Sequence, residues 1–277
     1  MSEQLNERDY QRLAGIIQDH TGIRMPSAKR VMVEGRLRRR LRALDISGFD
    51  DYCRFLFERN GLDSEFVHLI DAVTTNKTDF FREPNHFDFL RDEAVPALLA
   101  AQPPGDDMIR IWSAACSTGA EAYTIAMVLT DLARQRSGFR FSILGTDIST
   151  VVLKQAATAV YPAVMADPIP PEMRRNYIME ARDKTRCEIR VVPEIRRLVH
   201  FRQLNLMDER YPVDRDVDVI FLRNVLIYFD KKTQHAVLER LCGHLRPGGF
   251  LILGHSESMA GARLRLRQVV PTIFRRE

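Results

Sequence analysis

Residues 109–124 of the chain read IRIWSAACSTGAEAYT. The stretch opens with an apolar run, passes through small residues to Gly119, and continues with residues that favour a helix. This order predicts a strand, a tight turn and the start of a helix, which is where α/β proteins bring their backbone close to a cofactor. The complete dinucleotide fingerprint has three glycines, so this stretch alone is equally consistent with an ordinary strand-to-helix turn.

Later segments place polar residues where strands are expected to end. Residues 141–146, FSILGT, read as a strand and lead to Asp147, and an acid at this point is the usual acceptor for the hydroxyls of a ribose. Residues 205–208, NLMD, precede another apolar run, residues 219–222. Because the strands of an open parallel sheet end at one edge, these segments converge on one crevice. We therefore expect a site for a nucleoside cofactor.

Composition and charge describe a folded protein with an ordinary core. The chain has 277 residues, of which 45% are hydrophobic, enough for one large and one small domain. Its net charge of +4 is only mildly basic, so an acidic partner must meet a local patch of charge. The four cysteines and seven histidines lack the spacing of a disulfide framework or a metal site, and no run of about eighteen apolar residues occurs. We expect a cytoplasmic protein without a bound metal.

The pattern of apolar residues divides the chain into two domains. Residues 1–84 repeat apolar residues with a helical period and predict a small all-helical N-terminal domain. Over residues 85–277 strands alternate with helices, which predicts an α/β domain with a mostly parallel sheet covered on both faces. Residues 178–202 interrupt the alternation and predict a small antiparallel β insertion. The expected strands are 109–114, 140–146, 217–222 and 249–254, and the expected helices are 87–101, 120–136, 149–157 and 231–245.

Three motifs occur in a characteristic order along the chain. They are residues 74–83, TTNKTDFFRE, residues 112–115, WSAA, and residues 223–230, RNVLIYFD. With these motifs the chain resembles, over nearly its whole length, the CheR family of bacterial chemotaxis-receptor glutamate methyltransferases. The resemblance implies a class I, Rossmann-like methyltransferase fold. It also implies S-adenosylmethionine as methyl donor, S-adenosylhomocysteine as product, and a glutamate side chain of a receptor as acceptor.

The resemblance further assigns residues to the cofactor site. Glu121 is expected to hold the charged amino-acid part of the cofactor, although residues 119–123 read GAEAY where the family usually has Gly-Glu-Glu-Pro-Tyr. Arg82 is assigned to orienting the acceptor carboxylate or the edge of the cofactor through its planar guanidinium, and Tyr228 to supplying a hydroxyl near the reacting centre. The residues implied to line the cofactor site are Asn76, Thr78, Arg82, Glu121, Asp147, Asn205, Leu206, Arg223 and Asn224.

Without the resemblance, several residues have an ordinary structural interpretation. Asn76 and Thr78 are equally suited to a helix cap and turn before Pro84, and Arg82 to a surface salt bridge. His255 and Ser256 follow the last expected strand at the active edge of the sheet, so that a lining role is open for them.

A basic helix is predicted over residues 33–44, VEGRLRRRLRAL. Its apolar residues recur at helical spacing on one face, and arginines cover the remainder. Such a face is either simply solvated or a docking surface for acidic helices of a receptor. The resemblance favours docking by the N-terminal domain through Arg36, Arg39, Arg40 and Arg42.

Two other functions are compatible with the same fold. A nucleic-acid methyltransferase would bind phosphates through the basic helix, but residues 222–226, LRNVL, lack the Asn/Asp-Pro-Pro-aromatic box of enzymes directed at base amino groups. A non-catalytic adaptor that binds the cofactor or the receptor is disfavoured by the retention of Arg82 and Tyr228. We therefore expect cytoplasmic helices of chemotaxis receptors as partners, no nucleic acid and no insertion into the membrane.

The loop of the insertion bears on how a receptor is held. The segment 178–202 resembles the β-subdomain of the family, which in some members grips a peptide at the C-terminus of the receptor. Those members tend to carry glycines in the loop, whereas residues 180–187, EARDKTRC, contain none. We expect activity that does not depend on such a peptide.

Overall fold

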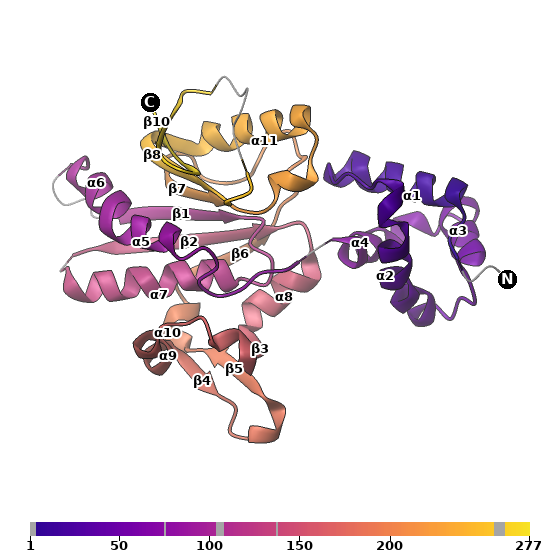
Figure 1. Ribbon diagram of the computed structural model, residues 1–277, viewed down its shortest axis with the longest axis horizontal. Coiled ribbons are helices and arrows are strands. Elements are labelled where there is room, and N and C mark those ends of the chain that lie inside the picture. Colours follow the sequence, from indigo (N-terminus) through magenta and orange to yellow (C-terminus); the bar gives the residue numbers. More distant parts are fainter. Residues whose placement is uncertain (1–3, 75, 104–107, 137, 258–263) are drawn as a thin grey trace.

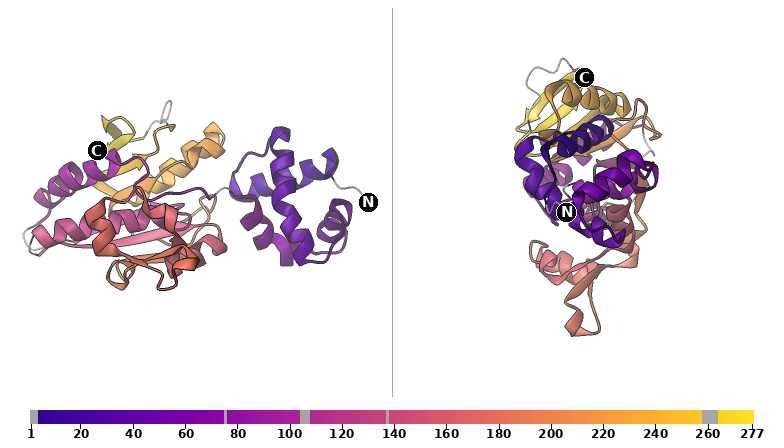
Figure 2. Two further views of the ribbon diagram at one scale, coloured as in Figure 1. Left: turned by 60° about the horizontal axis from the view of Figure 1, so that its bottom comes forward. Right: turned by 90° about the vertical axis from the view of Figure 1, so that its right-hand side faces the viewer.

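The structure is a computed structural model that describes residues 4–74, 76–103, 108–136, 138–257 and 264–277. A bundle of helices at the N-terminal end is joined to a larger part built around a sheet, and a small insertion projects from that larger part (Figures 1 and 2). Within the described ranges, no helix combines the length and apolar character needed to cross a membrane.

The N-terminal domain is a helical bundle whose local sequence sets the ends of its first helix. Its elements are α1 (Glu7–Thr21), η1 (Ser27–Lys29), α2 (Arg30–Ala43), α3 (Phe49–Glu58) and α4 (Leu62–Val73). The side chain of Asn6 accepts a hydrogen bond from the backbone N–H of Asp9 at the start of α1, and Gly22 ends the helix with a φ of 72°. Apolar residues such as Leu37 and Leu69 pack into one core between the helices.

The larger domain is built on a seven-stranded sheet in the order β6-β2-β1-β7-β8-β10-β9. The first five strands in this order are parallel, and β10 and β9 extend one edge in antiparallel fashion. The strands are β1 (Met108–Ala114), β2 (Arg140–Asp147), β6 (Val199–Gln203), β7 (Val217–Leu222), β8 (Leu245–Leu253), β9 (Leu266–Val270) and β10 (Ile273–Arg276). The predicted Rossmann-like α/β fold with a mostly parallel sheet is therefore confirmed.

Both faces of this sheet are covered because its central strands are apolar on both sides. Successive residues of a strand point to opposite faces, and Ile111 packs into one core cluster while Trp112 packs into another. All residues of β7 are buried. Phe87 and Ile125 join the first cluster, and Leu238 joins the second. The covering helices are α5 (Asn85–Phe89), η2 (Leu90–Ala94), α6 (Val95–Ala100), α7 (Ala120–Gln135), α8 (Thr150–Thr158) and α11 (Lys231–His244).

The insertion contains a separate antiparallel sheet in the order β3-β5-β4. It begins at β3 (Val160–Pro162), before the predicted start at residue 178. The predicted range 178–202 also reached into Val199–Gln203, but this segment is β6, which pairs in parallel with β2 at the edge of the main sheet. The apolar pattern of a short segment does not specify its partner strand, because the partner lies far away in the chain. The other elements are η3 (Ala163–Ala166), α9 (Pro171–Tyr177), β4 (Ile178–Glu180), η4 (Lys184–Arg186), β5 (Glu188–Val191) and α10 (Pro193–Arg196).

Candidate active site

A cavity opens at the carboxyl edge of the main sheet, where the sheet meets the N-terminal domain. Its lining comes from the ends of β1, β2 and β7, from the segment after α4, and from residues of the N-terminal domain that include Lys29. Every residue predicted for the cofactor site lines this cavity, and so does Tyr228. These residues are Asn76, Thr78, Arg82, Glu121, Asp147, Asn205, Leu206, Arg223 and Asn224. The topology has therefore brought residues from across the sequence to one place.

The turn between β1 and α7 is strained at the edge of the cavity. Ala115 and Ser117 have φ angles of 56° and 53°, in the left-handed region that side chains with a Cβ rarely adopt. Gly119 has a φ of 85°, and a Cβ there would lie 2.9 Å from the Cβ of Ala156. Only glycine fits this last position, because the start of α7 packs closely against Ala156 of α8. Ala115 and Ser117 of the same turn line the cavity.

Asp147, at the end of β2, is held by the backbone around it. One carboxylate oxygen accepts a hydrogen bond from the N–H of Ser117 at 2.9 Å, and the other accepts one from the N–H of Ser149, also at 2.9 Å. Burial raises the pKa of Asp147, whereas these backbone donors act in the opposite direction. Each carboxylate oxygen can accept a further hydrogen bond, so Asp147 retains capacity for the two hydroxyls of a ribose.

Arg223 is the centre of a buried charge network beside the cavity. Its side chain is 2% exposed and forms ion pairs with Glu121 at 2.9 Å and with Glu83 at 3.1 Å. A third hydrogen bond goes to the backbone oxygen of Arg82. Burial alone would raise the pKa of Glu83, but Arg223, the side chain of Asn224 and His255 together outweigh it and lower that pKa. Two carboxylates around one guanidinium leave the network with a net negative charge, which favours a cationic ligand.

Glu121 lies in the first turn of α7, where the sequence placed the acid for the cofactor. One of its carboxylate oxygens accepts a hydrogen bond from the hydroxyl of Ser113 at 2.7 Å, and the other pairs with Arg223. Glu121 is therefore oriented by both neighbours while still lining the cavity.

A residue that sequence reasoning missed holds the loop after β7. The carboxylate of Glu257 accepts hydrogen bonds from the backbone N–H groups of Asn224, Val225, Leu226 and Gly254, at 2.7–2.9 Å. Burial raises the pKa of Glu257, and the four backbone donors oppose that effect. This carboxylate positions the loop that carries Arg223, Asn224 and Tyr228. An acid just beyond a strand at the carboxyl edge is the signal that could have found it.

Arg82 and Tyr228 line the cavity and belong to different segments of the chain. The guanidinium of Arg82 donates a hydrogen bond to the backbone oxygen of Lys77 at 3.2 Å. Tyr228 ends the short helix η5 (Leu226–Tyr228), and the ammonium of Lys29 lies 5.5 Å from the centre of its ring. The backbone N–H of Arg24 donates to the carbonyl oxygen of Tyr228 at 2.9 Å. The N-terminal domain thus contributes one cation to the cavity and is tied to the tyrosine loop.

Two asparagines connect segments around the cavity. The side chain of Asn205 donates to the carbonyl oxygen of His20 at 2.7 Å, joining the sheet edge to α1. The carbonyl oxygen of Asn76 accepts from the hydroxyl of Ser117 at 2.9 Å, joining the segment after α4 to the strained turn. Asn76 is not a helix cap, because the next helix, α5, begins after Pro84.

The four arginines predicted for docking do not share one environment. Arg36 donates to the backbone oxygens of Val73 and Thr74 at 2.6 and 3.0 Å, and Arg40 makes two hydrogen bonds of 2.7 Å with Glu65, which is 2% exposed. Both side chains are half-buried, and these bonds tie them to groups of their own domain. Their role in docking stays a prediction. They flank the apolar stripe of α2, and their long stems let the charged ends reach inward. Arg39 and Arg42 are exposed, as predicted for a docking surface.

His255 and Ser256 do not line the cavity. They follow β8, which lies beyond β7 in the sheet, and His255 is exposed beside α5, where its ring pairs with the side chain of Asn85 at 3.1 Å. The lining role left open for these two residues is not supported by their position.

Comparisons with known proteins cover nearly the whole chain. A family model described as CheR methyltransferase, SAM binding domain, matches residues 76–274, and one described as CheR methyltransferase, all-alpha domain, matches residues 8–74. The chain is 35% identical over 274 residues to a chemotaxis protein methyltransferase of Borreliella burgdorferi, covering 98% of this chain and 95% of the relative. It is 38% identical over 266 residues to chemotaxis protein methyltransferase 2 of Pseudomonas aeruginosa, covering 96% and 92%.

Proposed function

The chain belongs to the CheR family of S-adenosylmethionine-dependent methyltransferases, and we propose that its acceptors are glutamate side chains of chemotaxis receptors. The observation that carries the proposal is the single cavity lined by all the residues expected for the cofactor site together with Arg82 and Tyr228. The names of the relatives place them in chemotaxis, which supports receptors as the substrates. Cytoplasmic helices of these receptors are the proposed partners, which makes the cytoplasm the proposed location of the protein.

The residues of the cavity fit the cofactor. Asp147 has spare acceptor capacity for a ribose, and the net negative charge around Arg223 suits a cationic ligand. We assign Glu121 to the charged amino-acid part, and Asn205 and Leu206 to the neighbouring wall. S-adenosylmethionine supplies a methyl group on a positively charged sulfur.

The acceptor makes few chemical demands on the protein. A glutamate side chain has an ordinary pKa of about 4.3 and is ionised at neutral pH, so no general base is needed. The main task is alignment, which in good intramolecular models contributes on the order of 7 kcal/mol or more. Arg82 and Lys29 are the cations of the cavity lining suited to orienting an incoming carboxylate, and the Lys29 ammonium lies 5.5 Å from the centre of the Tyr228 ring. Closure by the receptor would exclude water and strengthen these interactions.

Labelled methyl transfer tests the proposal directly. The protein is incubated with methyl-labelled S-adenosylmethionine and either receptor-containing membranes or RNA. We expect label in the membranes that alkali releases, because a glutamate methyl ester hydrolyses in base. Label in RNA alone would instead support the nucleic-acid methyltransferase. Cofactor binding measured by calorimetry, without any methyl transfer, would support a non-catalytic adaptor.

The same assay tests whether activity depends on the C-terminal peptide of the receptor. A receptor that lacks this peptide is expected to be methylated like the intact receptor.

We propose that Arg39 and Arg42 attract the acidic face of the receptor. Changing both to glutamate is expected to lower the rate of receptor methylation roughly tenfold at low ionic strength, because steering by surface charge acts on the association rate. The affinity for cofactor, measured by calorimetry, should stay the same. The matched control reverses Arg210 and Arg215, two exposed arginines outside the helical domain. Equal methylation rates for both double variants at low salt would contradict docking through α2.

A further inference from the structure

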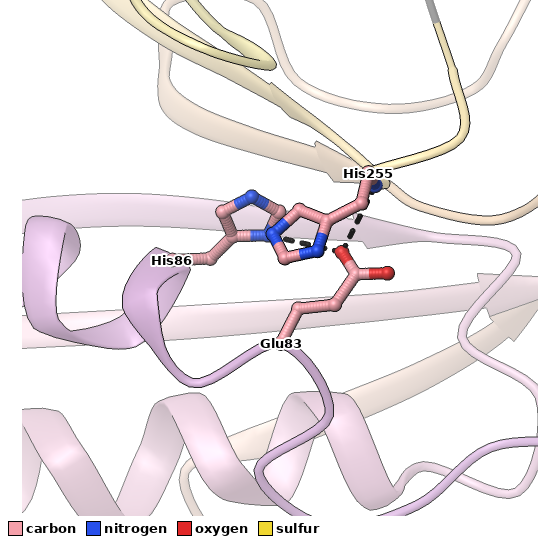
Figure 3. A group of neighbouring side chains, drawn as sticks. All are labelled: Glu83, His86 and His255. Carbon is pink, nitrogen blue, oxygen red and sulfur yellow. Dashed lines mark hydrogen bonds and ion pairs between the residues drawn. The ribbon is translucent and has the colours of Figure 1, made fainter.

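Three potential metal ligands meet outside the lining of the cavity. Glu83 lies just before α5, His86 lies within α5, and His255 follows β8 (Figure 3). One donor atom from each lies within 4.8 Å of those from the other two. The spacing of histidines in the sequence predicted no metal site, because His86 and His255 are brought together only by the fold.

The hydrogen bonds of His86 define which of its nitrogens carries a proton. His86 is fully buried, and its Nε2 lies 2.9 Å from the hydroxyl oxygen of Thr272. That hydroxyl donates its single hydrogen to the carbonyl oxygen of Pro271 at 2.6 Å, so it must accept from His86. Nε2 therefore carries the proton, and Nδ1 presents a lone pair.

This lone pair faces a carboxylate. Within the described part of the chain, Nδ1 of His86 has no hydrogen-bond partner, and it lies 3.5 Å from an oxygen of Glu83. The same oxygen of Glu83 already accepts from Arg223 at 3.1 Å and from the backbone N–H of His255 at 3.2 Å. The group left without a partner is therefore the buried lone pair of Nδ1, and a bound cation would supply that partner.

We propose that Glu83, His86 and His255 form a site for a divalent transition-metal ion of the Zn²⁺ type. Imidazole nitrogens and a carboxylate oxygen are the donors that Zn²⁺ commonly takes, and three protein ligands leave one position for water. Thr272 fixes the orientation of His86 from behind, as outer partners of metal-bound histidines usually do. His255 is exposed, so its ring can move toward the other two ligands at little cost.

The site is coupled to the cavity through Glu83. The same carboxylate pairs with Arg223 at 3.1 Å and accepts from the side chain of Asn224 at 3.3 Å, and both of these residues line the cavity. A metal ion bound to Glu83 competes with them for its oxygens. Metal binding therefore loosens the groups that shape the cofactor pocket and lowers the affinity for cofactor.

Zinc titration of chelator-treated protein tests the proposal. The experiment uses Cys187→Ser as the parent chain, since the thiol of Cys187 is exposed and is an alternative zinc ligand. We expect calorimetry to show one Zn²⁺ bound per chain, with affinity at least about tenfold weaker after His255→Asn. The matched control is His200→Asn, an exposed histidine on β6, which should bind zinc like the parent.

A second measurement tests whether metal binding changes the affinity of the cavity for its ligand. Zinc is expected to weaken the binding of S-adenosylhomocysteine to the parent chain at least about tenfold and to have little effect in the His255→Asn variant. The absence of zinc binding, or equal zinc affinity in the parent and the His255→Asn variant, would overturn the metal site. Neither result depends on which substrate is methylated. A failure of the metal site therefore leaves the proposed function untouched, and the labelled methyl-transfer assay tests that function by itself.

Discussion

Replacing Glu257 by alanine is expected to lower the free energy of unfolding by about 3–5 kcal/mol. The carboxylate accepts four backbone hydrogen bonds in a buried place, and each buried donor left without an acceptor costs about 1–3 kcal/mol. Water entering the space left by the side chain recovers part of this loss. The change also releases the loop of residues 223–229, so the affinity for cofactor should fall together with stability.

Chemical denaturation followed by circular dichroism measures this effect. Glu257→Gln keeps one carbonyl oxygen as an acceptor and should show a smaller loss than Glu257→Ala. Glu239→Ala removes an exposed glutamate from α11 and should stay within about 0.5 kcal/mol of the parent. If Glu257→Ala were as stable as Glu239→Ala, the loop would have to be held by something other than this carboxylate.

Removing the guanidinium of Arg82 is expected to slow methyl transfer by about 10- to 150-fold while the fold persists. A hydrogen bond to a charged group contributes about 1.5–3 kcal/mol, and each 1.36 kcal/mol changes a rate tenfold. Among the described residues, the side chain of Arg82 makes one hydrogen bond, to the backbone oxygen of Lys77, so Arg82→Ala should cost little stability. The rate is measured as methyl incorporation into receptor at saturating and at limiting cofactor, which separates a loss of binding from a loss of alignment.

Two further variants serve as controls for the Arg82 experiment. Arg82→Lys keeps the charge without the planar fork and should fall between the parent and Arg82→Ala. Arg91→Ala removes an arginine whose ion pairs, with Asp88 and Asp92, lie on the surface, and should leave the rate unchanged. Unchanged turnover in Arg82→Ala would refute the role assigned to Arg82.

The sequence alone predicted the layered fold because its signals are local. Each central strand carries apolar residues at successive positions, as in residues 219–222, and this pattern indicates burial on both faces wherever the strand pairs. Gly119 and Asp147 mark strand ends, and strand ends of a parallel sheet meet at one edge. The convergence of these segments was therefore predictable from the pattern, whereas Asn76, Thr78, Arg82 and Glu121 were assigned to the site only by the resemblance to the family.

The sequence could not specify contacts between residues that lie far apart along the chain. The guanidinium of Arg40, a residue predicted for docking, pairs with Glu65, which lies on another helix of the same domain. Val199–Gln203 was read as part of the insertion, yet its backbone pairs with β2. In both cases periodicity describes the segment correctly but says nothing about its partner.

By itself, the sequence pattern determined the order of helices and strands, the burial of the sheet on both faces and the strand ends that meet at its carboxyl edge. These features follow from periods of two and 3.6 residues and from glycine and acid residues at strand ends. Only the tertiary structure decided that Glu257 holds the loop after β7, that Arg36 and Arg40 bond to groups of their own domain, and that His86 meets His255. The physical reason is that hydrogen bonds and ion pairs are satisfied by whichever groups the packing brings within reach, and packing joins residues that no local pattern relates.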